Sequence, residues 1–169
     1  MKRATHILLG AAVAMPIAAS VSPLVAAGVV WLGMVGGGYP DWVDLRSDLS
    51  SRLKHRGVSH SLIVGAGLTF GLYLILELAV AQFSRFTVTE GEMQALAIAF
   101  AAGFLSHIVA DACTHAGVSP FLPVSRAKVW VLPKPLRGKS NGALDTIGRF
   151  VAISLILVSS WTFLQPYIG

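Results

Sequence analysis

Long apolar segments constrain this chain more than any other feature. They fall at residues 6–20, 23–38, 60–82, 93–115 and 144–165. A membrane-spanning helix needs roughly 20 apolar residues, and the last three segments meet that length. Only 12% of the residues are charged, whereas a soluble domain has about a quarter. The sequence therefore predicts an all-α, multi-pass transmembrane bundle of about five helices, forming one domain over residues 1–169 and embedded in a lipid bilayer.

The first two apolar segments are short, and the stretch "SVSP" separates them. Proline is tolerated in the first turn of a helix, so Ser22 followed by Pro23 favours a helix start and a tight helical hairpin. One long helix, kinked at Pro16 and Pro23, is the alternative. The basic start and apolar stretch also resemble a signal peptide. The second apolar run argues against that interpretation, because a cleaved peptide does not need it.

Three other boundaries have physical signals in the sequence. Thr89 and Glu92 have the spacing of a capping box, which predicts a helix start at about residue 90. In "SNGALD", Ser140 or Asn141 is a candidate cap, and Asp145 would lie in the first turn, where the helix dipole favours an acid. The loop over residues 117–141 contains four prolines and cannot be a continuous helix.

Basic residues are concentrated in three segments: the N-terminus, the loop 39–59 and the loop 116–141. The loop 83–92 instead carries one arginine and two glutamates. With five spans, the three basic segments share one side, which the positive-inside rule assigns to the cytoplasm. We therefore expect an inner (cytoplasmic) membrane protein with a cytoplasmic N-terminus. Four spans would place the N-terminus opposite the other basic segments, which fits less well.

All five histidines and every aspartate fall near this same face in the five-span arrangement. His107 and Asp111 are four residues apart on one predicted helix, so their Cβ atoms would lie about 5–6 Å apart. A divalent ion could bridge them, although a buried hydrogen bond that fixes helix packing is an equal alternative for the pair alone. Further residues of the same types favour a metal site at the cytoplasmic end: His6, Asp41, Asp44, His55 and His60.

Imidazole and carboxylate together suit zinc, with manganese or iron as alternatives, and one site could hold two or more ions. A single cysteine, Cys113, argues against a structural thiolate zinc site. Thr114 and His115 lie within the same broad stripe as His107, and Asp145 opens the last helix, so these three could support the ligands. Asp48 is interpreted as solvated surface.

The order of these motifs resembles the YdjM family of inner-membrane proteins, which are regarded as metal-dependent hydrolases and also described as LexA-binding. "TH" followed by Gly10, "YPDWVD", "HRGVSHS" and "GFLSHIVADACTHAGVSPFLP" match the family's motifs in order, and "SNGALD" matches a fifth motif more weakly. The resemblance covers nearly the whole chain. Two residues separate Asp41 from Asp44, where the family has one, and no histidine follows Asp44; Asp41 is therefore the safer ligand.

The resemblance implies an all-helical site distantly similar to that of zinc-dependent phospholipase C, and hence phosphoester hydrolysis by metal-activated water. Asp41 is then the candidate bridging ligand or base. Arg56 would stabilise phosphate charge, because its planar fork matches phosphate oxygens. A phospholipid or another amphipathic phosphoester suits a site at the membrane surface, and no direct nucleic-acid binding is expected. A non-catalytic metal-containing regulatory protein and a metal transporter are the alternatives, and the oligomeric state is open.

Overall fold

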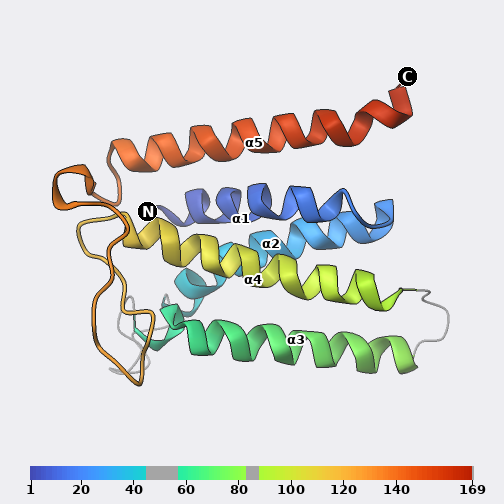
Figure 1. Cartoon of the computed structure of the whole chain (residues 1–169), viewed down its shortest axis with the longest axis horizontal. Helices are drawn as coiled ribbons and strands as arrows, with labels where there is room; N and C mark the ends of the chain where they lie inside the picture. The colour runs from blue at the N-terminus through green and yellow to red at the C-terminus, as the bar shows by residue number, and fades with distance from the viewer. Residues whose placement is uncertain (45–56, 83–87, 169) are drawn as a thin grey trace.

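The computed structural model describes residues 1–44, 57–82 and 88–168, and within them five α-helices run side by side in alternating directions (Figure 1). The helices are α1 (Arg3–Ala18), α2 (Pro23–Asp44), α3 (Leu62–Gln82), α4 (Glu90–Ala112) and α5 (Ala143–Ile168), with short 3-10 turns η2 (Val58–His60) and η3 (Lys134–Leu136). Among the described helices, α2 to α5 are long and apolar enough to cross a membrane. The predicted all-helical fold is confirmed.

The first two apolar segments form a hairpin, as predicted, and the single kinked helix is wrong. Residues 19–22 connect α1 to α2, and Pro23 is the first residue of α2. The 16 residues of α1 extend only about 24 Å. Because α1 packs against α2, α4 and α5, much of its surface faces protein instead of lipid, and it can be shorter than the other helices.

The backbones of α1, α2 and α4 approach closely at glycines. A Cβ atom on Gly10 of α1 or on Gly103 of α4 would collide with the carbonyl oxygen of Gly33 in α2. A Cβ atom on Gly37 would collide with the carbonyl oxygen of His6. Small residues at such positions allow membrane helices to pack backbone to backbone. This packing sets the spacing between the histidine-bearing turns of α1 and α4.

The predicted capping box at the start of α4 is confirmed. Thr89 Oγ1 accepts the Glu92 N–H at 3.2 Å, and Glu92 Oε2 accepts the Thr89 N–H at 3.0 Å. The other carboxylate oxygen of Glu92 accepts the backbone N–H of Ser22, so the hairpin turn is tied to α4. At the opposite end, the loop 113–142 is attached to α3, because the Leu62 N–H donates to the Pro120 carbonyl at 2.9 Å.

Two helix boundaries differ from the sequence prediction. α2 continues through Pro40 to Asp44, so Asp41 and Asp44 lie three residues apart on one helical face, close enough to share neighbours. α4 ends at Ala112, because the chain turns there: the Thr114 N–H donates to the Asp111 carbonyl, and the His115 N–H donates to Gly138 in the loop. Thr114 and His115 are therefore not on the helical stripe of His107, and that expectation is wrong.

Candidate metal centre

Four elements bring imidazole and carboxylate groups together at the loop-rich end of the bundle. They contribute His6 (α1), Asp41 (α2), His60 (η2), and His107 and Asp111 (α4). The three histidines are 0% exposed and Asp111 is 1% exposed, whereas the Asp41 side chain is 14% exposed. Ionisable groups buried at one end of a membrane bundle are energetically expensive and usually mark a functional site.

His107 is held with one ring nitrogen free for a ligand bond. Its Nδ1 lies 2.8 Å from the Gly37 carbonyl oxygen. A carbonyl can only accept, so Nδ1 carries the proton and Nε2 keeps its lone pair; this tautomer is assigned from the partners. The His6 ring stacks on His107 with ring centroids 3.8 Å apart. Metal-binding histidines are commonly oriented in this way by a backbone carbonyl.

His60 is oriented by Ser59 and Asp44. The Ser59 hydroxyl donates to Asp44 Oδ1 at 2.6 Å, and its oxygen lies 3.0 Å from His60 Nδ1. A hydroxyl has one proton, and Ser59 gives it to the carboxylate, so Nδ1–H of His60 must donate to the hydroxyl oxygen. Nε2 of His60 again keeps its lone pair. Asp44 Oδ2 lies 3.7 Å from Nδ1 of His60, which places Asp44 on the side of the ring away from Nε2.

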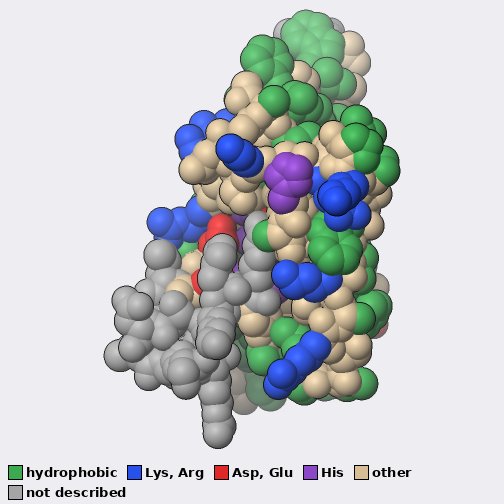
Figure 2. Space-filling view, turned by 90° about the vertical axis from the view of Figure 1, so that its left-hand side faces the viewer, with side chains coloured by type: hydrophobic (Ala, Val, Ile, Leu, Met, Phe, Trp, Pro, Cys, Tyr) green, Lys and Arg blue, Asp and Glu red, His purple; other side chains and the backbone are tan. Residues whose placement is uncertain are grey.

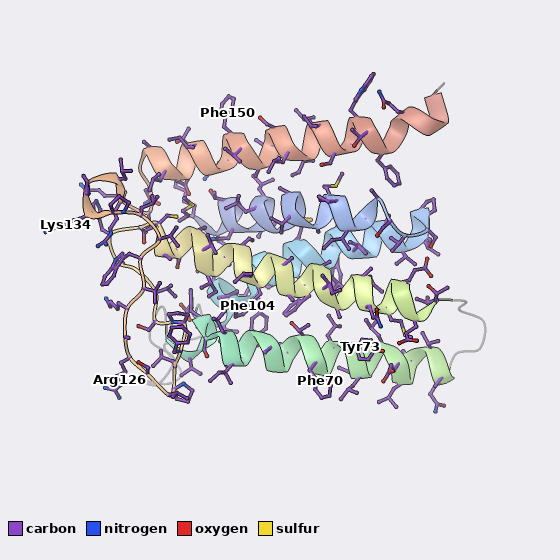
Figure 3. All side chains as sticks on the ribbon, in the orientation of Figure 1. Phe70, Tyr73, Phe104, Arg126, Lys134 and Phe150 are labelled. Carbon is purple, nitrogen blue, oxygen red and sulfur yellow. The ribbon has the colours of Figure 1, made fainter. Side chains whose placement is uncertain are left out.

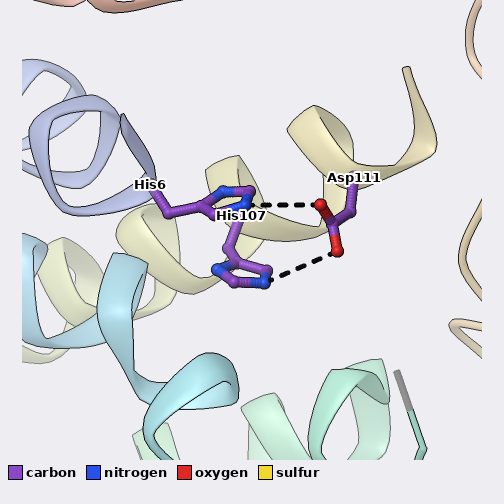
Figure 4. A group of neighbouring side chains, drawn as sticks. All are labelled: His6, His107 and Asp111. Atoms are coloured by element: carbon purple, nitrogen blue, oxygen red, sulfur yellow. Dashed lines mark ion pairs between the residues drawn. The ribbon is translucent and has the colours of Figure 1, made fainter. Parts of the chain in front are cut away.

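His6 is a buried polar side chain without a hydrogen bond in the described part of the chain. Among the described residues, neither of its ring nitrogens has a hydrogen-bond partner, although the ring is fully buried. Its Nε2 lies 3.3 Å from Asp111 Oδ1, and Figure 4 shows His6 and His107 facing this carboxylate together. An unsatisfied buried polar group costs about 1–3 kcal/mol, so this position calls for a further partner such as a cation.

The separations between donor atoms are those of ligands around one ion. Nε2 of His60 and Nε2 of His107 are 3.1 Å apart, and Asp111 Oδ2 lies 3.6 Å and 3.8 Å from them. Two ligands of a tetrahedral zinc ion lie about 3.3 Å apart, given zinc–nitrogen bonds of about 2.0–2.1 Å. Changes of about 0.5 Å or less in each separation would therefore suffice.

Two overlapping groups of donor atoms lie close enough together to hold a metal ion. Within each group all of the atoms lie within 4.8 Å of one another. One contains His6, His107 and Asp111; the other contains Asp41, His60 and His107. His107 belongs to both groups, but its Nε2 lone pair can bind only one ion at a time, so the two groups describe alternative positions for one ion, and a second ion would depend on the remaining donors. The predicted buried His/Asp cluster is present, and it could bind metal.

The charge of this donor set fits a divalent ion. Neutral imidazoles and the carboxylates of Asp41 and Asp111 together offer two negative charges, which a buried site must compensate. A cation already contacts this cluster: the Met1 ammonium lies 2.8 Å from Asp111 Oδ1. Burial raises the pKa of the nearby Cys113 thiol, which disfavours the thiolate form that binds metals. The imidazole nitrogens and carboxylate oxygens of this cluster could therefore hold a divalent metal ion.

The other predicted site residues lie apart from these donors or outside the described residues. Thr114 is buried, but its hydroxyl donates to the Asp111 backbone carbonyl at 2.8 Å, and His115 is exposed. Asp145 is buried against the start of α1, where its Oδ1 accepts the Lys2 N–H at 2.7 Å. His55 and Arg56 lie outside the described residues.

Sequence reasoning missed two groups that orient the histidines. Ser59 stands directly before His60 inside "HRGVSHS", and a hydroxyl beside a candidate ligand was an available signal. The Gly37 carbonyl left no such signal, because its position depends on how closely α2 packs against α4. Arg149 was also missed; it pairs with Asp145 at 3.1 Å, four residues earlier on α5.

Basic side chains surround this end of the molecule. Figure 2 shows lysines and arginines spread over the face, with carboxylates visible at its centre beside the grey atoms. The loop between α4 and α5 contributes Arg126, Lys128, Lys134, Arg137 and Lys139. A basic rim around a carboxylate-containing centre would attract anions as well as hold a cation.

Comparison with protein families gives a match over residues 1–167 to the family described as YdjM inner membrane protein. The chain belongs to the YdjM family. No curated protein and no solved structure matches it. Family membership agrees with the apolar helices of the described structure, and it identifies this YdjM protein as an inner membrane protein embedded in a lipid bilayer.

Proposed function

We propose that this YdjM-family protein is a membrane-bound, metal-dependent hydrolase that cleaves a phosphoester. The observation that carries the proposal is the shared position of His107. It belongs to both donor groups, but its Nδ1 proton is held by the Gly37 carbonyl, so its single lone pair can bind one ion, and a second ion would be held by the other members of its group. Two ions about 3.5–4 Å apart are a common arrangement in enzymes that cleave phosphoesters.

A divalent ion bound there would supply Lewis acidity, lowering the pKa of a bound water and neutralising charge on the substrate. His60 and His107 would hold that ion through Nε2, with their Nδ1 protons kept by Ser59 and Gly37. Asp41 is more exposed than the other donors, which suits a base or bridging ligand at the substrate side. In the reaction, a water oxygen bonds to phosphorus, the bond to the leaving alcohol breaks, and one water proton passes to the leaving oxygen.

The site would face the cytoplasm. The N-terminus and the loop 113–142, both rich in lysine and arginine, lie at the same end of the bundle as the site (Figure 1), and cytoplasmic loops carry such an excess. The C-terminus lies at the other end. Alkaline phosphatase fused after Gly169 should then be active outside the inner membrane; an inactive fusion that is fully expressed would reverse the orientation.

A non-catalytic, metal-containing regulatory protein is the second candidate. It is favoured by the complete burial of His6, His60 and His107, because a structural site is closed by protein ligands while a catalytic site keeps an open position. A transporter is disfavoured, because its ligands should lie near the middle of the membrane.

The deciding experiment is elemental analysis of the purified protein, followed by turnover of soluble phosphoesters. We expect bound zinc, manganese or iron, together with hydrolysis that chelation abolishes. The matched variants are His107→Ala, which should lose hydrolysis, and His115→Ala, an exposed histidine whose loss should leave hydrolysis intact. Metal-loaded protein that cleaves none of the phosphoesters would favour the regulatory role.

A further inference from the structure

An apolar groove runs along the outside of the bundle between α3 and α4. It has a volume of about 540 Å³, and its walls include Leu62, Ala66 and Tyr73 of α3 and Ala101 and Phe104 of α4. Figure 3 shows Phe104 and Tyr73 in the space between the two helices. Leu62 and Tyr73 are eleven residues apart on α3, so the groove is about 16 Å long.

α3 and α4 approach closely near the start of α3. Gly65 lies against the Phe104 ring, so closely that a Cβ atom there would collide with it. Further along, alanines of α4 leave the space between the helices unfilled. Among the described elements, α3 packs against α4 and η2. In a bilayer this hollow faces hydrocarbon, and its exposed lining is mostly apolar.

One end of the groove adjoins the metal centre. Leu62 follows His60 by two residues, and Phe104 precedes His107 by one helical turn. The turn η2 therefore connects the groove, which begins at Leu62, to His60 of the candidate metal centre. The basic loop is also near: the Pro120 carbonyl accepts the Leu62 N–H, and Figure 3 shows Arg126 of the same loop at this end of the bundle, beyond the start of α3.

We infer that this groove binds one acyl chain of a bilayer glycerophospholipid and thereby holds the lipid's phosphate beside η2. The inference rests on the proposed function, since it names the substrate class of the same centre. The apolar length of the groove matches a chain, the basic loop matches the phosphate, and the bilayer supplies the ligand. A groove that holds the chain would orient the phosphoester before cleavage.

The test uses full-length protein in phosphatidylcholine vesicles containing phosphatidylglycerol that is spin-labelled on one acyl chain. Electron paramagnetic resonance measures the immobilised fraction of the label, and a spin-labelled diacylglycerol without phosphate is the reference lipid. We expect more immobilised phosphatidylglycerol than diacylglycerol. Ala66→Phe, which fills the groove from α3, and Ala101→Phe, which fills it from α4, should each abolish this excess.

Gly67→Phe is the matched control, because a Cβ atom there meets nothing within 4 Å and residue 67 is not in the groove wall. The control should keep the excess. Equal immobilisation of the two lipids, or equal loss in Gly67→Phe, would overturn the inference. Metal content and turnover of a soluble phosphoester are measured in parallel; wild-type protein lacking both would instead overturn the proposed function.

Discussion

The Nε2 atoms of His60 and His107 face each other at 3.1 Å, although the hydrogen-bond partners of each ring assign its proton to Nδ1. The Gly37 carbonyl holds that proton on His107, and the Ser59 hydroxyl holds it on His60. Two lone pairs therefore point at one another in a fully buried site. Such an arrangement is stable only with a positive charge between them, either an additional proton or a metal ion, and Asp111 Oδ2 lies within 3.8 Å of both nitrogens.

The position of His107 predicts a specific pattern of metal loss. His107→Ala should lose the most metal, because His107 is a donor in whichever of the two groups holds an ion, whereas His6→Ala affects only one group. We expect His6→Ala to keep about half of the metal if two ions are bound. Mass-spectrometric metal analysis of purified protein measures this. Full metal content in His107→Ala would mean that the His107–Asp111 pair serves helix packing.

Ser59 should raise the metal affinity of the centre by orienting His60, although Ser59 does not itself bind the ion. Ser59→Ala removes the acceptor for Nδ1–H of His60 and the link to Asp44. Loss of a residue that orients a metal ligand lowers affinity about 10–100-fold. Competition with a chelator measures the change. Ser106→Ala is the control, because the Ser106 hydroxyl donates to the Gly103 carbonyl of its own helix; equal weakening in both variants would refute the role of Ser59.

The helices were predictable because their signals are local. Apolar length indicated the segments, and Thr89 with Glu92 indicated the start of α4. The grouping of His6, Asp41, His60, His107 and Asp111 at one end followed from counting spans, because five antiparallel helices return these residues to the same face.

The details of the centre were not predictable, because they depend on packing between distant segments. The hydrogen bond from His107 to Gly37 joins residues 70 positions apart, and it requires the close approach of α2 and α4 at Gly33 and Gly103. Asp44 looked like a ligand because carboxylates bind metals. Its bond to Ser59 is visible only once η2 is placed against the end of α2.

Helix packing at Gly103 should be sensitive to a single methyl group. In Gly103→Ala the new Cβ atom would meet the Gly33 carbonyl, which is backbone and cannot move aside easily. We expect a loss of about 1–3 kcal/mol in the free energy of unfolding, as for other overpacked cores. Gly67→Ala, where a Cβ atom meets nothing within 4 Å, should be neutral or slightly stabilising. Thermal unfolding in detergent compares the two variants, and equal midpoints would contradict this packing.

Asp145 should stabilise the attachment of α1 to α5. Its Oδ1 accepts the Lys2 N–H and the Thr5 hydroxyl at 2.7 and 2.8 Å, and its Oδ2 pairs with Arg149. Asp145→Ala leaves buried donors unsatisfied, which costs about 1–3 kcal/mol. The same thermal measurement should show a smaller further loss when Arg149→Ala is added than Arg149→Ala causes alone. Strictly additive losses would show that Asp145 and Arg149 act independently.

Variants of Arg56 distinguish a hydrolase from a non-catalytic metal-containing protein. This prediction comes from the sequence, in which Arg56 lies between the candidate ligands His55 and His60. An arginine repels a cation, so its place between metal ligands makes sense when an anion must bind there as well. Arg56→Ala should keep the metal but lose vanadate binding and phosphoester turnover. Arg56→Lys should recover only part of both, because lysine lacks the bidentate fork.

If Arg56 serves only membrane orientation, lysine replaces it fully. Metal content, vanadate affinity and turnover of the two variants distinguish these roles, and full turnover in Arg56→Lys would remove the case for phosphate binding at this loop.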